Sequence, residues 1–211
     1  GSRITINGEH VKLLGFNRHD LYPGMGPTLS VDVYRQDLAL LKEMGSNFIR
    51  GCHYPQDQRF LDLCDEAGML VWHEALAWGN SVETLTDPHF MAAEVGTANA
   101  MVDSSMNNPS VILWGFFNEG RSDDPNATAS YATMSRTFKD RDPSRLVTWA
   151  SNRQTRDKGF EYADVISFNG YPGWCVPPRS PHSHTYTGLA NWMRCTGMVV
   201  VPTQWLIPGK M

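Results

Sequence analysis

The stretch Val111-Ile112-Leu113-Trp114-Gly115-Phe116-Phe117-Asn118-Glu119 joins a long apolar run to an amide and a carboxylate. A run that is apolar on both faces predicts a buried strand of an α/β sheet, because a half-exposed strand would alternate polar and apolar residues. A carboxylate directly after such a run is costly to bury unless it is paired or takes part in chemistry. The stretch therefore predicts a parallel sheet with a site at the carboxyl end of its strands.

Helices and short apolar strands alternate on both sides of this stretch. A hairpin is expected over 4–14, because Asn7-Gly8 suits a type I′ turn between strands 4–6 and 11–14. Ser30, Asp57 and Asp87 are expected helix N-caps. Further strands are expected at 47–50, 69–72, 111–117, 146–149 and 165–168, and a further helix at about 127–140.

This order predicts parallel strands joined by helical crossovers, which fits a doubly wound sheet or an α/β barrel. No Gly-rich phosphate loop follows any of the expected strands, which disfavours the doubly wound, nucleotide-binding alternative. We therefore expect a (β/α)8 barrel. The active sites of such barrels lie at the carboxyl ends of the strands.

Charge and hydropathy exclude several classes of protein. The 211 residues include 22 Asp and Glu against 18 Lys and Arg, a net charge of −4. That balance disfavours nucleic acid and anionic membranes as partners. No apolar run approaches the length of a membrane span, and no signal-peptide pattern is present, so a soluble globular protein of unassigned compartment is expected.

The cysteines and histidines give no sequence signature of a metal site. Cys52, Cys64, Cys175 and Cys195 lack C-x-x-C spacing and are interpreted as buried or free thiols. His182 and His184 lie in a Pro-rich segment without a third ligand nearby and are interpreted as loop residues. We therefore expect neither a metal nor a cofactor.

Polar side chains follow several of the expected strands. These strand ends carry Arg50 to Pro55, His73-Glu74, Asn118-Glu119 and Asn169. Together they favour a functional site over a set of unrelated structural residues. A rim of Trp72, Trp78, Trp114 and Trp174 would suit the apolar faces of sugar rings, although a tryptophan in a strand is usually a core residue.

Five motifs in fixed order resemble the catalytic barrel of glycoside hydrolase family 2. They are the segments 6–20, 51–55, 63–71, 108–119 and 142–145, within a resemblance that covers residues 4–174. The resemblance implies retaining hydrolysis of β-glycosides without a cofactor. Segments 147–152 and 164–174 are most similar to the β-glucuronidase branch. That branch usually has a tyrosine where this chain has Cys175.

The resemblance also implies roles for individual residues. Glu119 would be the general acid/base, and Asn118 would bind the sugar 2-hydroxyl. Arg50 is expected to bind a carboxylate in the barrel floor, and Glu74 to give structural support. Asp20 and His19 are each expected either to line the pocket or to have a structural role. The implied substrate contacts are Asn118, His53, Tyr171, Asn169, Trp174 and Asp20.

The second carboxylate of a retaining site is missing from the sequence after Asp164. Residues 165–211 contain no Asp or Glu, whereas retaining hydrolysis uses two carboxylates about 5–5.5 Å apart. We expect residues 1–174 to form strands 1–6 of an incomplete barrel. Residues 175–211 either supply strand seven, with Gln204 at the nucleophile position, or are unrelated sequence. Little or no turnover is therefore expected.

Three functions remain open at this point. The first is hydrolysis of terminal β-D-glucuronides, and the second is β-galactosidase or β-mannosidase activity of the same family. The third is a non-catalytic carbohydrate-binding remnant. The expected partner is a β-glycoside, either a small molecule or an oligosaccharide, and self-association into a homo-oligomer is compatible with each.

Overall fold

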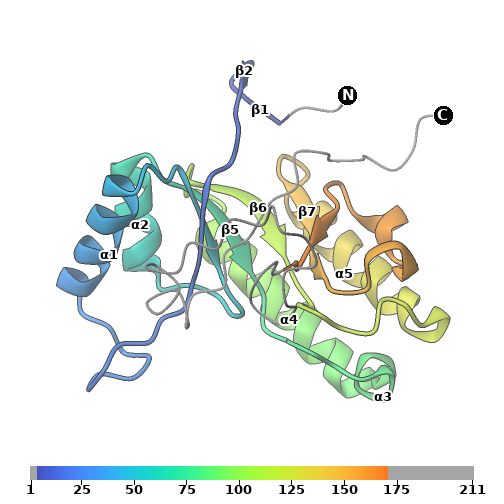
Figure 1. Cartoon of the computed structure of the whole chain (residues 1–211). Coiled ribbons are helices and arrows are strands. Elements are labelled where there is room, and N and C mark those ends of the chain that lie inside the picture. The colour runs from blue at the N-terminus through green and yellow to red at the C-terminus, as the bar shows by residue number, and fades with distance from the viewer. Residues whose placement is uncertain (1–3, 171–211) are drawn as a thin grey trace, which may run out of the picture.

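The computed structural model describes residues 4–170 and is built around a five-stranded parallel sheet (Figure 1). The strands follow one another in the sheet in the order of the chain. They are β3 (Gly15–Arg18), β4 (Phe48–Gly51), β5 (Leu70–Glu74), β6 (Val111–Gly115) and β7 (Leu146–Thr148). A doubly wound sheet reverses its strand order at a switch point. The unreversed order therefore confirms the barrel type.

A second small sheet continues the same arrangement. Strand β8 (Ala150–Ser151) lies one residue beyond β7 and pairs in parallel with β9 (Ser167–Phe168). The amide N–H of Val165 also donates to the carbonyl of Val147, at 3.3 Å. The β7–β8 segment thus borders β6 through its first half and β9 through its second. The described residues supply six successive barrel positions, as expected for strands 1–6.

Helices connect the strands and lie against the sheet (Figure 1). They are α1 (Val31–Glu43), α2 (Gln58–Ala67), α3 (Val82–Thr86), α4 (Pro88–Ser105) and α5 (Thr128–Arg141), with short 3₁₀ turns η1 (Pro125–Ala127), η2 (Gln154–Arg156) and η3 (Phe160–Tyr162). Ser30, Asp57 and Asp87 accept hydrogen bonds from the first turns of α1, α2 and α4, which confirms the three expected N-caps.

Several expected boundaries were wrong. The hairpin consists of β1 (Thr5–Ile6) and β2 (Glu9–His10), because a two-residue Asn-Gly turn pairs residue 6 with residue 9. The segment 11–14 therefore leads into β3 rather than forming the second hairpin strand. Strand β6 ends at Gly115, where its pairing with β5 and β7 ends. His73 and Glu74 belong to β5, and helix α3 was not expected from the sequence.

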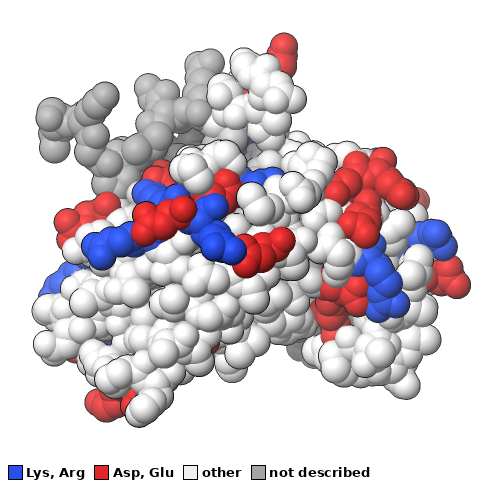
Figure 2. All heavy atoms as spheres, turned by 180° about the vertical axis from the view of Figure 1, so that it is seen from behind, with Lys and Arg blue, Asp and Glu red and all other residues white. Residues whose placement is uncertain are grey.

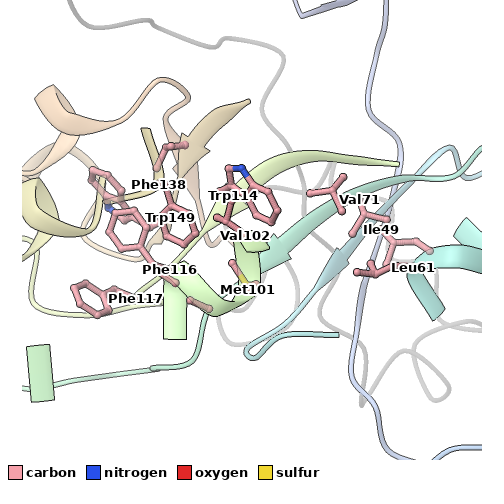
Figure 3. Close-up of a cluster of buried hydrophobic side chains, with 14 of the residues drawn as sticks. Ile49, Leu61, Val71, Met101, Val102, Trp114, Phe116, Phe117, Phe138 and Trp149 are labelled. Atoms are coloured by element: carbon pink, nitrogen blue, oxygen red, sulfur yellow. The ribbon is translucent and has the colours of Figure 1, made fainter. Parts of the chain in front are cut away.

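Alternation along the strands separates two apolar clusters. The larger cluster lies between sheet and helices and includes Ile49, Val71, Met101 and Phe138 (Figure 3). The smaller cluster lies on the other face and includes Phe48 and Trp72, among others. Because successive strand residues point to opposite faces, Arg50 and Glu74 share the face of Trp72. The helices thus bury one face, and the opposite face presents polar residues.

Charged side chains of both signs lie on the surface (Figure 2). On the face shown in Figure 2, acidic and basic side chains lie beside one another. Among residues 4–170, no helix is both long and apolar enough to span a bilayer. Cys52 and Cys64 are buried free thiols, as expected. Cys175 and Cys195, like His182, His184 and Gln204, lie outside the described residues.

Candidate active site

A buried ion pair forms the floor of the site. The Arg50 guanidinium donates to Glu74 twice, from Nε to Oε2 at 2.7 Å and from Nη2 to Oε1 at 3.0 Å. Both side chains are completely buried, and the guanidinium lies 4.5 Å from the ring centroid of Trp72. Burial by itself raises the pKa of Glu74, but the Arg50 charge and the hydrogen bond to His53 outweigh burial and lower it. The carboxylate that Arg50 was expected to bind is therefore Glu74.

The chain after β6 turns sharply to present Asn118 and Glu119. Phe117 and Glu119 have φ values of 46° and 55°, in the left-handed region that non-glycine residues rarely adopt. The turn is fixed by the Glu119 N–H, which donates to the carbonyl of Ala150 at 3.0 Å. Arg153 also donates to the carbonyl of Glu119, at 3.3 Å. Such strain is maintained where surrounding contacts enforce it, and it is typical of functional sites.

Asn169 links the two residues of this turn to the floor. Its Nδ2 donates to Glu119 Oε1 at 2.7 Å and to Asn118 Oδ1 at 3.0 Å. Arg50 Nη2 also donates to Asn118 Oδ1, at 2.8 Å. Asn118 is buried, whereas Glu119 is partly exposed. The network therefore orients the Glu119 carboxylate while leaving it open to a ligand.

His53 lies at the edge of this network. Its Nδ1 is 2.8 Å from Glu74 Oε1 and 3.3 Å from Arg50 Nη2. The ring of His19 lies edge-on to it, with centroids 5.3 Å apart. Burial, followed by the nearby His53 and Arg50, lowers the pKa of His19. His19 is therefore neutral at physiological pH.

Asp20 lies outside the Glu119 network, in an ion pair with Arg18. Its side chain is buried, and its backbone N–H donates to the Tyr54 hydroxyl at 2.8 Å. This placement gives Asp20 a structural contact, and its contact with substrate stays a prediction. The expected contacts Tyr171 and Trp174 lie outside the described residues, as does the division at residue 174.

The aromatic rim is reduced to one described tryptophan. Trp72 and Trp114 are core residues, with 1% and 0% of their surface exposed, so their expected place on the rim was wrong. Trp78 is 65% exposed, and its ring is parallel to that of His53, with centroids 6.4 Å apart. Its loop is held by a hydrogen bond of 2.8 Å from the Gly79 N–H to the Asn118 carbonyl. Trp78 therefore borders the site as a fixed apolar surface.

The structure thus brings together four of the predicted site residues: Glu119, Asn118, Asn169 and His53. It also groups Cys52 with His19 and His53, a cluster that sequence reasoning missed. The adjacent Cys52 and His53 after a strand were the one available signal.

The partly exposed Glu119 carboxylate, hydrogen-bonded to the amide of Asn169, lies beyond the carboxyl ends of the strands, which is where barrel active sites are found. The family profile described as "Glycosyl hydrolases family 2, TIM barrel domain" matches residues 1–193. The chain belongs to glycosyl hydrolase family 2. In this family 2 chain, Asn118 and Glu119 follow β6 after Phe116 and Phe117.

Relatives within family 2 carry several activities in their names. A β-galactosidase of Thermoanaerobacterium thermosulfurigenes is 33% identical over 168 residues, covering 79% of this chain and 22% of that protein. A β-glucuronidase of Bacteroides fragilis is 31% identical over 176 residues, covering 80% of this chain and 25% of that protein. The chain therefore spans about a quarter of the length of these relatives.

Solved family 2 structures share the fold closely. The β-galacturonidase of Eisenbergiella tayi bound to galacturonate has a TM-score of 0.82 at 36% identity, covering 92% of this chain and 34% of its own. The β-glucuronidase of Ruminococcus gnavus in complex with uronic isofagomine has a TM-score of 0.79 at 27% identity, covering 83% of this chain and 32% of its own. Uronic acids and their analogues are thus ligands of family 2 proteins with this fold.

Proposed function

We propose that this chain carries the acid/base half of a retaining β-glycosidase site for β-linked uronic acids, with β-D-glucuronides as the first candidate. The observation that carries the proposal is the partly exposed Glu119 carboxylate, held by Asn169 beside Asn118. The choice of uronic acids as the sugar in this proposal is supported by the ligands bound in similar family 2 structures. Galacturonides are the second candidate, supported by the Eisenbergiella tayi enzyme.

Glu119 would donate its proton to the glycosidic oxygen as the bond from C1 to that oxygen breaks. In a retaining site, a second carboxylate bonds to C1 as the leaving group departs as a neutral alcohol. Water then displaces that carboxylate from C1 and gives its proton to Glu119. Asn118 Oδ1 accepts from Arg50 and Asn169, which leaves Nδ2 to donate to the sugar 2-hydroxyl. That contact strengthens as positive charge develops on the ring.

The lack of a second carboxylate in this sequence limits the reaction that the chain would catalyse alone. Residues 165–211 contain no Asp or Glu, so this sequence offers no nucleophile where the family places one. An amide such as Gln204 does not form a glycosyl ester. In this proposal, the chain binds the glycoside and supplies the proton but completes few turnovers.

Azide supplies the missing nucleophile in a direct test. The purified chain would be incubated with azide and the β-glucuronide, β-galacturonide or β-galactoside of 4-methylumbelliferone. Azide attacks C1 opposite the leaving group and forms a carbon–nitrogen bond, so the expected product is the α-glycosyl azide. Glu119→Gln should lower this rate by about 10²–10⁴-fold, because a phenol of this acidity needs a proton donor.

A matched substrate separates acid catalysis from general damage. From 2,4-dinitrophenyl glucuronide, the 2,4-dinitrophenolate anion leaves without needing a proton. Glu119→Gln should therefore retain most of the azide-dependent rate on this substrate. Equal losses on both substrates would contradict an acid role for Glu119. A folded chain that binds glucuronide but forms no azide product would be a carbohydrate-binding remnant. A preference for the galactoside would favour the β-galactosidase alternative.

A further inference from the structure

Three potential metal ligands converge where β3 and β4 end. His19, Cys52 and His53 each offer one ligand atom, and these atoms all lie within 4.8 Å of one another. Among residues 4–170, no second group of three or more His, Cys, Asp or Glu side chains meets this arrangement. We propose that His19, Cys52 and His53 form a binding site for Zn²⁺. The proposal departs from the sequence expectation, in which no metal site was found.

The distances fit a zinc ion with a small closure of the site. Zn–N bonds of about 2.1 Å and Zn–S bonds of about 2.3 Å in a tetrahedron separate the nitrogen and sulfur by about 3.6 Å. His19 Nε2 and Cys52 Sγ are 3.5 Å apart. The group as a whole spans up to 4.8 Å, so roughly 1 Å of movement completes the triangle.

Hydrogen bonds already orient both imidazoles as metal ligands. Glu74 Oε1 lies 2.8 Å from His53 Nδ1, and with the proton on Nδ1 the lone pair of Nε2 is available to an ion. A carboxylate behind a ligating histidine is the usual outer shell of zinc sites. The Tyr54 hydroxyl lies 3.4 Å from His19 Nδ1, on the side of the ring opposite Cys52. Each ring thus has its Nδ1 within hydrogen-bond distance of a neighbouring side chain.

The thiol needs the metal to become a ligand. Burial raises the pKa of Cys52 to about 12, so the sulfur stays protonated and unreactive without an ion. Binding would replace the S–H bond by an S–Zn bond and release one proton to the buffer. The nearby Arg50 charge is balanced by the two hydrogen bonds to Glu74. Imidazole and thiolate together favour zinc over magnesium or calcium.

Cobalt titration tests the site independently of any hydrolysis. The purified chain, stripped with a chelator, would be titrated with Co²⁺ while the thiolate-to-cobalt charge-transfer band is followed, and then with Zn²⁺. We expect one equivalent of Co²⁺ to produce the band and one equivalent of Zn²⁺ to abolish it. Cys52→Ser should remove the band and weaken zinc binding by at least about 100-fold, since even losing an outer-shell partner costs 10–100-fold.

Matched variants decide whether the band comes from this site. Cys64→Ala alters the other described buried thiol, on α2, and should leave band and affinity unchanged. A serine hydroxyl can keep the hydrogen bond that Cys52 makes to the Arg18 carbonyl. His19→Gln, at a partly exposed position, gives a second way to weaken binding. A band that persists in Cys52→Ser, or none in the folded chain at millimolar Co²⁺, would overturn the proposal.

Discussion

Replacing Glu74 by glutamine removes a buried charge while preserving the size of the side chain. The substitution leaves the Arg50 guanidinium buried without the carboxylate that now accepts from Nε at 2.7 Å and from Nη2 at 3.0 Å. It also leaves one neutral oxygen where Arg50 and His53 Nδ1 now share the two oxygens of a carboxylate. Both members of the ion pair have no exposed surface, so solvent does not replace the lost interaction.

The expected cost follows from this burial. Removing one partner of a buried ion pair costs about 3–5 kcal/mol, and the amide oxygen recovers part of it, so we expect about 3 kcal/mol. For a chain of this size, that loss lowers Tm by about 6–12 °C. The sign of the pH dependence is also fixed. Because the folded-state pKa of Glu74 is lowered, its stabilisation is present above the ordinary value of 4.5. It is lost as the pH falls through the folded value.

Urea unfolding of the wild type and Glu74→Gln at pH 7 and pH 4 measures both effects. The difference in unfolding free energy should be largest at pH 7 and should shrink at pH 4. Asp32→Asn, in the exposed pair of Asp32 and Arg35, is the control and should change little. A loss below about 1 kcal/mol at pH 7 with unchanged m would refute the reasoning, because the pair would then be effectively solvated.

Three further outcomes are expected. Burial raises the pKa of Glu94 to about 7, so its ionisation should destabilise the fold as pH rises from 5 to 8, whereas burial lowers the pKa of His73 to about 3 and acts in the opposite sense below its ordinary value of 6.5. The Tm of Glu94→Gln relative to the wild type should therefore rise between pH 5 and pH 8, and a constant difference would contradict the burial argument. A Cβ at Gly115 would lie 1.9 Å from Trp72 Nε1, so Gly115→Ala should cost about 1–3 kcal/mol in urea unfolding. Gly96→Ala, on an open surface of α4, should instead stabilise by about 0.5–1 kcal/mol, and equal effects of the two would refute this. Trp78→Ala should weaken calorimetric binding of an aryl glucuronide about 2–10-fold but not that of glucuronate, and a parallel loss for both would argue against an aromatic platform.

The sequence alone determined the features that depend on neighbouring residues. Ser30, Asp57 and Asp87 were recognisable as caps because a cap accepts from an amide two or three positions later. The apolar run before Asn118 and Glu119 indicated a buried strand with a polar end. The motif order also identified the family that the profile match confirmed.

The tertiary structure decided what depends on contacts between distant segments. Strand β6 ends at Gly115 because its pairing with β5 and β7 ends there, which the apolar run through Phe117 does not reveal. Trp72 and Trp78 were both candidates for the aromatic rim, yet neighbouring elements bury the first and leave the second exposed. The roles of Tyr171 and Trp174 stay predictions.

In the candidate site, too, the sequence determined some features and the tertiary structure determined others. Sequence supplied the residue types, including Glu119 as an acid and Arg50 as the partner of a carboxylate. It did not show that Asn169 donates to Glu119 across 50 positions, or that His19 approaches Cys52 across 33. Parallel pairing of β3 with β4 and of β8 with β9 creates those contacts. Local sequence fixes which groups are available, and long-range strand pairing fixes which of them meet.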